Sequence, residues 1–334
     1  SAASDVYKRQ KLTRNALFHD AENVALDEVH IHVAQSAADA YAGFQSGAFD
    51  ITDSFPDDQL STIQQNQPGV LRSEPQWAIY WYVFNTNDTK LADPRVRQAL
   101  TMAIDRDHIT SSVLTQPGSQ PSYSLVPPAM PSYGEPNTPD WTLLDHAGRQ
   151  ELALELLEEA GYGPETPFNV TVSFNNAEDH QRVMDAVRED WEKIGVVVEA
   201  DEADFQSHLD KLETGNFQIG RRTWVASFDM PEYFLNLFLS HASTLNVGRY
   251  KNQLFDEIMG RALNTSSLED RNKLLREAEA VALNDAVAAP IYSYVNQTLV
   301  QNYVAGWIDN PTSRHALRFL DVNRPAKPVE PLSD

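Results

Sequence analysis

The chain has 334 residues, which is long enough for two domains with separate hydrophobic cores. It carries 26 Lys and Arg against 48 Asp and Glu, and the resulting net charge of −22 excludes a surface that attracts nucleic acid or anionic membranes. The sequence contains no cysteine, which excludes disulfides, thiolate metal sites and a cysteine nucleophile. No run of about 18 apolar residues is present, so we expect no membrane-spanning helix.

The two ends of the chain differ in character from the rest. The first ten residues, SAASDVYKRQ, are interpreted as a non-native leader, residues 1–10. No basic start precedes an apolar segment, so the sequence shows no signal peptide, and an exported form would have its signal in a missing N-terminus. Residues 324–334 are polar and rich in proline, and we expect them to form a mobile tail.

The segment after the leader predicts the start of an α/β domain. Val29, Ile31 and Val33 alternate with two histidines, which predicts a half-buried strand. His30 and His32 share one strand face and could bind a metal, but spacing fixes no third ligand nearby, so a solvated face is the preferred interpretation. Three predicted elements follow: a helix over residues 37–47, a short strand from Phe49 and a polar helix over residues 56–65.

A buried strand and an amphipathic helix come next. Residues 79–84 are rich in aromatic and β-branched side chains and end at Asn85, which favours a turn. Asp93 can accept hydrogen bonds from the free amides of a first helical turn, and Pro94 suits a position that needs no N–H. Apolar residues at helical spacing predict one buried face on this helix: Val96, Ala99, Leu100, Ala103 and Ile104.

The remainder of the chain predicts a second α/β unit. Residues 116–141 contain seven prolines and little periodicity, so we expect a long irregular loop. The strand–helix–strand order after this loop implies a parallel crossover. The predicted elements are a helix over residues 152–160, strands over 168–174, 196–199 and 217–224, helices over 177–194, 204–212, 254–263 and 268–283, and a buried strand over 288–296.

Catalytic signatures are missing from the sequence. It contains no GxSxG elbow, P-loop, GxGxxG, HExxH or EF-hand loop. Acidic residues are so numerous that accidental acid–base spacing is expected, which makes a carboxylate-based hydrolase an alternative only. We therefore expect no catalytic residue, no metal site and no cofactor.

The most informative stretch is residues 217–238, FQIGRRTWVASFDMPEYFLNLF. A β-rich run ends in Trp224, and a turn with Asp229 and Pro231 leads into an aromatic helix. Arg221, Trp224 and Asp229 thus lie where a parallel strand ends, which is the edge at which open α/β sheets bind ligands. The alternative is that Trp224 is a core aromatic residue.

Two segments resemble bacterial extracellular solute-binding proteins of the oligopeptide-binding class, family 5. One is the aromatic strand ending in Asn85 together with ADPRVRQALTMAIDRD, and the other is the pattern of Arg221, Trp224, Ala226, Phe228, Asp229 and Pro231. The resemblance covers about Leu12 to Asn323. It implies an α/β, two-lobed periplasmic-binding-protein fold of type II (venus-flytrap), without the N-terminal part of lobe I and a small extra domain.

The resemblance also divides the chain. It implies that residues 11–78 belong to lobe I, residues 79–291 form lobe II, and residues 292–323 return to lobe I. The strands near Ile79 and Ile291 would be the paired hinge crossings, at which two lobes close over a ligand.

Ligand-binding roles follow from the same resemblance. Ser227 stands where oligopeptide-binding members carry the Asp that pairs with a peptide's α-ammonium, and a serine cannot neutralise that charge. Either Asp229 serves instead, or the ligand is not anchored by a free amino terminus. His180 and Arg221 match residues that face the ligand's carboxyl end, although a solvated helix start is an equal alternative for His180. The candidate ligand-binding residues are Trp224, Arg221, Thr223, Val225, Ser227, Asp229, His180, Trp77, Ala78, Tyr292 and Tyr294, with core packing as the alternative for the two tyrosines.

The implied function is that of a non-catalytic substrate-binding component of an ABC transporter, which captures oligopeptides between two lobes for uptake. Peptides would be held by main-chain hydrogen bonds, as if a strand were added to a sheet. The implied partners are a peptide and a membrane ABC permease, with a monomeric protein, no nucleic acid and no direct membrane insertion. The location would be periplasmic, or extracellular with a lipid anchor on the missing N-terminus. The alternatives are another solute (a dipeptide, an oligosaccharide or a nickel chelate), a carboxylate-based hydrolase, or a sensor domain with the same fold.

Overall fold

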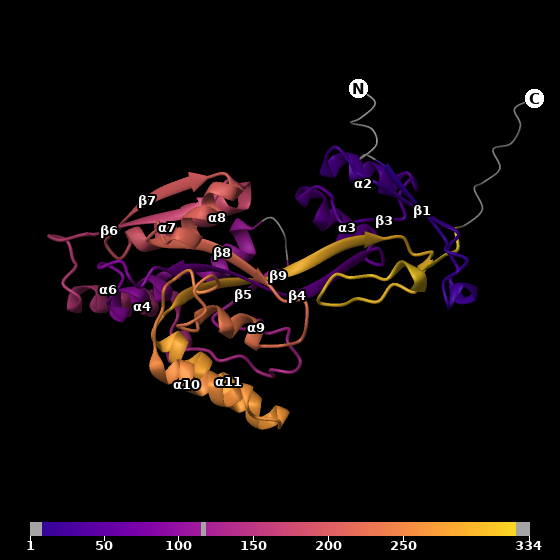
Figure 1. The fold of residues 1–334 in the computed structure, drawn as a ribbon. Helices are drawn as coiled ribbons and strands as arrows, with labels where there is room; N and C mark the ends of the chain where they lie inside the picture. Colours follow the sequence, from indigo (N-terminus) through magenta and orange to yellow (C-terminus); the bar gives the residue numbers. More distant parts are fainter. Residues whose placement is uncertain (1–8, 115–117, 325–334) are drawn as a thin grey trace, which may run out of the picture. The chain divides into compact units, whose positions relative to one another are not determined.

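The computed structural model describes residues 9–114 and 118–324 (Figure 1). The chain divides into two compact units, one containing the residues up to Glu74 and from Asn296 onwards, the other Pro75–Val295. Two strands, β4 (Leu71–Phe84) and β9 (Ala288–Val300), contain the points at which the chain passes from one unit into the other. The lobe boundaries drawn from the sequence stay a prediction.

The first unit consists of short elements. Strands β1 (Arg9–Thr13) and β2 (Glu28–His32) form an antiparallel pair, and β10 (Val304–Ala305) pairs with β11 (Asp321–Val322). Strand β3 (Ile51–Thr52) pairs with the last residues of β9. Helices α2 (Ala37–Gln45) and α3 (Leu60–Asn66) supply part of a small core, which consists of Tyr41, Phe44, Ile63, Val70 and Leu299.

Strand β2 forms where the sequence predicts a strand, but the prediction that it is half-buried is wrong. Ile31 is 42% exposed and Val33 is 66% exposed. The reason is that β2 pairs with β1 in a two-stranded ribbon, and its side chains line a hollow instead of a packed core. Alternation of apolar and polar residues thus identified the strand without identifying what covers it.

The predicted leader and tail lie partly outside the described residues, which begin at Arg9 and end at Arg324. Arg9 and Gln10 pair with His32 and Ile31 in the β1–β2 ribbon. Arg324 forms an ion pair with Asp50, with 2.6 Å between Nη2 and Oδ2. Residues 1–8 and 325–334 of the two predictions are not described.

The second unit is organised around a mixed sheet with the order β9–β4–β8–β6–β7. Strand β8 (Ile219–Val225) is antiparallel to β4, whereas β6 (Phe168–Asn175) is parallel to both β8 and β7 (Val196–Ala203). The parallel pairing of β6 and β7 across helix α7 (Glu178–Glu192) confirms the crossover that the sequence predicts. The short strand β5 (Gln120–Pro121) pairs with β9.

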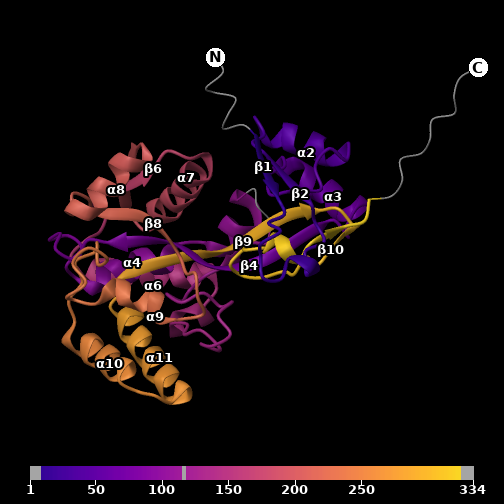
Figure 2. The same ribbon diagram turned by 45° about the vertical axis from the view of Figure 1, so that its right-hand side comes forward.

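Helices cover both faces of this sheet (Figure 2). Alternate residues of β4 point to opposite faces, so Tyr80, Tyr82 and Phe84 enter one core cluster and Ile79 and Trp81 enter the other. The first cluster includes side chains of α4 (Pro94–Ala103), α6 (His146–Glu159) and α7, and the second includes side chains of α9 (Glu232–Leu235), α10 (Gln253–Leu263) and α11 (Leu268–Asn284).

The buried carboxylate of Glu279 is one of the groups that hold the long proline-rich segment to this unit. Its Oε1 accepts from Ser124 Oγ at 2.5 Å and from the amides of Leu125 and Val126, and its Oε2 accepts from Tyr133 OH at 2.6 Å. The segment contains β5 and a 3₁₀ turn (Asp140–Leu143), and is otherwise irregular as predicted. Residues 116 and 117 of the prediction lie outside the described chain.

Candidate functional site

Strand β8 carries four of the predicted site residues, Arg221, Thr223, Trp224 and Val225, and its position depends on Gly220. A Cβ built on Gly220 would lie 2.3 Å from Leu212 Cδ2 of helix α8 (Phe205–Thr214). The strand can therefore approach α8 closely only because this residue has no side chain. Arg221, the next residue of β8, is thereby placed beside α8, and its carbonyl accepts a hydrogen bond from His208 of that helix.

One edge of β8 is unpaired at its carboxyl end. The amide of Ala226 donates to the carbonyl of Trp77 at 2.8 Å, and the register pairs Val225 with Ala78. Because hydrogen-bonded and non-hydrogen-bonded pairs alternate in an antiparallel ladder, the main-chain groups of Arg221, Thr223 and Val225 point away from β4. On that side β6 pairs with β8 only at Ile219 and Gly220. Within the described residues, no strand pairs with the edge formed by Thr223 and Val225.

Arg221 lies at the start of this edge and is only 9% exposed. Its Nη1 donates to Asn175 Oδ1 at 3.1 Å, and its Nη2 donates to Thr223 Oγ1 at 2.6 Å and to Tyr294 OH at 3.3 Å. The guanidinium carbon lies 5.0 Å from the centre of the Tyr80 ring. All of these partners are neutral, and Nε has no partner in the described part of the chain. A buried cation without a carboxylate is a suitable receptor for an anionic group of a ligand.

Two histidines lie close to this cation. The His180 ring, at the start of α7, is 5.5 Å from the Tyr80 ring, and its Nδ1 is buried without a partner in the described residues. Burial, together with the charge of Arg221, lowers the pKa of His180 to about 3. His208 donates from Nε2 to the carbonyl of Arg221 at 2.8 Å, and burial lowers its pKa as well. Both imidazoles are therefore neutral near pH 7, which leaves Arg221 as the charged group.

The two predicted hinge tyrosines have different environments. Tyr292 is 3% exposed and stacks on Tyr80, with 4.8 Å between ring centres. Burial raises the pKa of Tyr292 well above its ordinary value. Tyr294 is partly buried, and its hydroxyl lies 2.8 Å from Thr223 Oγ1. Tyr292 is thus a packing residue, whereas Tyr294 presents a polar atom to the cluster around Arg221.

Trp224 and Trp77 lie on the opposite face of the sheet from Arg221. The guanidinium of Arg222 is 5.0 Å from the centre of the Trp224 ring, and the ring of Tyr233 is 5.9 Å away. Nε1 of Trp224 is buried without a partner among the described residues, whereas Trp77 Nε1 donates to the carbonyl of Ala129 at 2.9 Å. Ala78 is fully buried and Val225 is 56% exposed.

The turn after β8 contains the other two predicted residues. Asp229 Oδ1 accepts from Ser132 Oγ at 2.6 Å, and Oδ2 accepts from the Ser132 amide at 3.0 Å. The carboxylate therefore holds the proline-rich segment. Ser227 is partly buried and contributes only an uncharged hydroxyl.

The structure brings Arg221, Thr223, Tyr292, Tyr294 and His180 into one cluster and leaves Trp224 and Trp77 on the other face. Sequence reasoning missed Tyr80, Asn175 and His208, which complete the cluster. Asn175 could have been found, because it directly follows the strand predicted over residues 168–174, and the carboxyl ends of parallel strands share one edge of a sheet. Nothing in the sequence places His208 beside Arg221.

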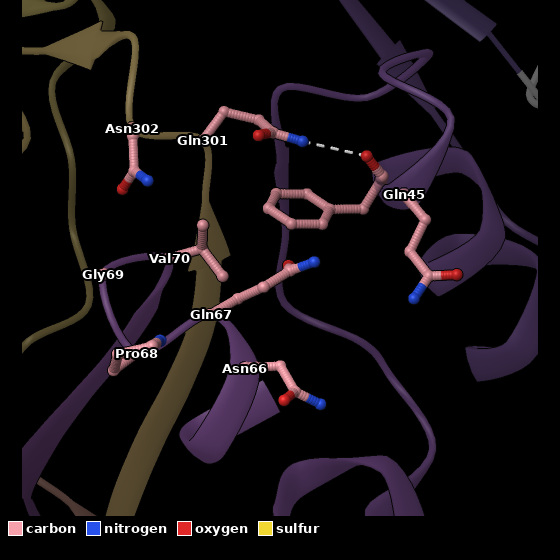
Figure 3. Close-up of a pocket in the computed structure, with 9 residues that line it drawn as sticks. Gln45, Asn66, Gln67, Pro68, Gly69, Val70, Gln301 and Asn302 are labelled. Carbon is pink, nitrogen blue, oxygen red and sulfur yellow. Dashed lines mark hydrogen bonds between the residues drawn. The ribbon is translucent and has the colours of Figure 1, made fainter. Parts of the chain in front are cut away.

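The described residues contain no group of three or more histidine or acidic side chains able to hold a metal. Two cavities were found in the first unit, and no predicted site residue lines either of them. One, of about 380 Å³, is surrounded by the amide side chains of Gln45, Asn66, Gln67, Gln301 and Asn302 (Figure 3). The other, of about 980 Å³, lies against β2 and α2. None of the described helices has both the length and the hydropathy of a membrane-spanning helix.

Comparison with known proteins identifies relatives of this chain. The periplasmic murein peptide-binding protein MppA of Escherichia coli is 32% identical over 302 residues, which is 89% of this chain and 55% of that protein. The periplasmic oligopeptide-binding protein OppA of Salmonella typhimurium is 30% identical over 304 residues, 90% of this chain and 55% of that protein. The chain thus spans about half the length of these relatives.

Solved structures agree with the sequence relatives. The murein tripeptide-binding protein MppA of Escherichia coli matches with a TM-score of 0.80 at 30% identity, covering 94% of this chain and 62% of that one. The complex of Haemophilus influenzae OppA with RPPGFSPFR matches with a TM-score of 0.78 at 25% identity, over 94% of this chain and 62% of that one. The predicted α/β periplasmic-binding-protein fold is therefore confirmed for the matched part.

The family model for bacterial extracellular solute-binding proteins, family 5 Middle, matches residues 4–246, which include β8 and the members of the cluster around Arg221 other than Tyr292 and Tyr294. The chain belongs to the bacterial extracellular solute-binding proteins of family 5.

Proposed function

We propose that this protein is the substrate-binding component of an ABC transporter and that it captures oligopeptides. The observation that carries the proposal is the unpaired edge of β8 at Thr223 and Val225, which begins at the buried cation of Arg221. An extended peptide can add to such an edge through its main chain, and main-chain hydrogen bonds do not depend on side-chain identity. Relatives named as peptide-binding proteins support this choice of ligand over other solutes.

The direction of the bound peptide follows from the charge of the site. Arg221 is the cation at the start of the edge, so the peptide's terminal carboxylate would lie there and form charge-assisted hydrogen bonds. The peptide would then run antiparallel to β8, with its amino end toward Ser227. Thr223 and Val225 would pair with its main chain, and Tyr294 and His180 would line the carboxylate end.

The opposite face would receive ligand side chains. Residues of an added strand alternate between the two faces of the sheet, so every second side chain would point toward Trp224 and Trp77. Trp224 offers a large apolar surface together with an N–H that has no acceptor among residues 9–114 and 118–324. The same geometry suggests that Tyr292 and Ala78 support the site by packing, and that Asp229 supports it by holding Ser132.

The proposal includes no catalytic step. The cluster around Arg221 contains a cation, hydroxyls, an amide and two neutral histidines, without a carboxylate that could act as a partner acid or base. A membrane ABC permease as the transport partner and a periplasmic or extracellular location are part of the same proposal, and family membership supports both.

Isothermal titration calorimetry with peptides of two to five residues tests this proposal. We expect binding of peptides with a free C-terminal carboxylate, and a loss of affinity of about tenfold or more in Arg221→Met, because a charge-assisted hydrogen bond typically contributes about 1.5–3 kcal/mol.

The matched control is Arg276→Met, since Arg276 also donates to an uncharged acceptor, the carbonyl of Tyr133 at 2.8 Å, and also lies over an aromatic ring. It should leave peptide affinity unchanged. The proposal is contradicted if the wild-type protein binds no peptide in this length range, or if both variants lose affinity equally.

A further inference from the structure

At the point where β6 and β8 separate, His208 donates the hydrogen bond that a main-chain amide of β6 would otherwise donate to β8. The parallel ladder between them ends at the pair Ser173–Gly220, yet the carbonyl of Arg221 still points toward the β6 side. In a continued ladder this carbonyl would accept an amide of β6. Instead it accepts from Nε2 of His208 at 2.8 Å.

The protonation state of this histidine is fixed by its surroundings. A carbonyl oxygen only accepts hydrogen bonds, so Nε2 must carry the hydrogen. Nδ1 is buried and has no partner in the described chain, and the side chain is 1% exposed. Burial, the largest effect, lowers the pKa of His208, and the charges of Arg221 and Lys211 lower it further; the hydrogen bond to the Arg221 carbonyl and the charge of Asp201 raise it, but by less in total. The ring is therefore a neutral, single-direction donor.

The position of this donor decides where the unpaired edge begins. Because the Arg221 carbonyl is occupied, an added strand can first pair at Thr223. The same bond fixes the main chain of Arg221, whose guanidinium is then directed by Asn175 and Tyr294. The imidazole of His208 thus fixes the distance between the first free pairing position, Thr223, and the guanidinium of Arg221.

We propose that His208 is a positioning residue for ligand binding: it ends strand addition at Thr223 and holds Arg221 where it meets the ligand's terminal carboxylate. This inference rests on the proposed function. It implies that the site distinguishes a free carboxylate from an amide at the same position, and that this discrimination depends on the Nε2–H donor.

Two substitutions separate the donor from the volume of the ring. His208→Leu removes the donor and keeps an apolar side chain, whereas His208→Gln keeps an N–H donor at a similar reach. Leu212→Val is the control, because it weakens the packing of the same helix against Gly220 without touching Arg221. For each protein the affinities of tri-alanine and of its C-terminal amide are measured by calorimetry, and their ratio is compared.

The wild type should bind the free acid about tenfold or more tightly than the amide, as expected for one charge-assisted hydrogen bond. His208→Leu should reduce this ratio to near one, while His208→Gln and Leu212→Val should retain most of it. A merely structural role would lower the melting temperature of His208→Leu and leave the ratio unchanged, which would overturn the inference. A loss of the ratio in His208→Gln equal to that in His208→Leu would also overturn it.

A second measurement needs no ligand. Nitrogen-15 spectra of the imidazoles should show His208 with hydrogen on Nε2 alone between pH 5 and pH 8. Hydrogen on Nδ1, or a doubly protonated ring in this range, overturns the role of His208 and leaves the proposed function standing. If the wild type binds neither tri-alanine nor its amide, the proposed function itself is contradicted, and the inference about His208 that rests on it is contradicted as well.

Discussion

Tyr80 on β4 stacks against Tyr292 on β9, with 4.8 Å between ring centres and 17° between ring planes. The guanidinium carbon of Arg221 lies over the Tyr80 ring of this stack, 5.0 Å from the ring centre. Tyr292 also contacts Tyr294, whose hydroxyl meets Thr223. The stacked pair therefore supports both the cation and the hydroxyl of the cluster, although neither tyrosine offers it a charge.

Removing the Tyr292 ring should destabilise the protein more than removing its hydroxyl alone. Tyr292→Ala is expected to lower the free energy of unfolding by about 3–5 kcal/mol, the usual cost of deleting a buried aromatic side chain. Tyr292→Phe keeps the ring and should lower it by less than about 1 kcal/mol. Urea unfolding measures both values, and equal losses in the two variants would show that the hydroxyl, not the stack, is important.

His180 should make stability depend on pH in a defined window. Burial and Arg221 lower the pKa of His180 to about 3, whereas an unfolded histidine has a pKa near 6.5. Between these values the unfolded chain binds a proton that the folded chain does not, so the free energy of unfolding rises with pH from about 3 to 6.5. Above that window the contribution is fully present.

The comparison with His180→Gln isolates this effect from other titrating groups. The wild type should gain stability relative to the variant as the pH rises from 4 to 7, measured by urea unfolding at both values. A difference between the two proteins that does not change with pH would contradict the assignment.

The amino end of a bound peptide should contribute little to affinity. Ser227 is uncharged, and the carboxylate of Asp229 is occupied by the hydroxyl and amide of Ser132. Acetylation of the peptide's N-terminus should therefore change the affinity by less than about threefold, since no ion pair is lost. Ser227→Asp should create a preference for the free amine. A large loss on acetylation in the wild type would show that Asp229 leaves Ser132 to bind the ammonium.

The buried carboxylate of Glu279 should be essential to the fixed path of the proline-rich segment. Glu279→Ala removes the carboxylate that accepts from Ser124, Tyr133 and two main-chain amides, which should cost roughly 3 kcal/mol or more of stability. Glu277→Gln, at an exposed position of the same helix, should stay within about 0.5 kcal/mol of the wild type. Similar unfolding midpoints for the two variants would contradict this role.

Local sequence signals predicted most elements because the signals are themselves local. Asp93 accepts from the Arg95 amide at 2.9 Å and Pro94 begins α4, as the capping pattern indicated. Strand β4, however, begins at Leu71, eight residues before the predicted start, because residues 71–78 have no apolar run and owe their extended form to pairing in the sheet. The exposure of Ile31 was unpredictable for a similar reason, since it depends on what packs against the ribbon.

The candidate site was predictable only in part. The end of a parallel strand indicated Arg221 and Trp224, but a strand sequence does not say that these two side chains face opposite sides of a shared sheet. Asn175 and His208 come from other elements, and their meeting with Arg221 requires β6 to separate from β8 after Ser173. That separation is a tertiary feature with no sequence pattern.

Amide hydrogen exchange at Thr223 and Val225, followed by NMR with and without a tripeptide, tests the central claim most directly. Both amides point to the unpaired edge of β8, so they should exchange rapidly in the free protein and become protected when a peptide pairs with them. Protection of these amides in the free protein, or unchanged exchange on saturation with a peptide that binds, would contradict the account.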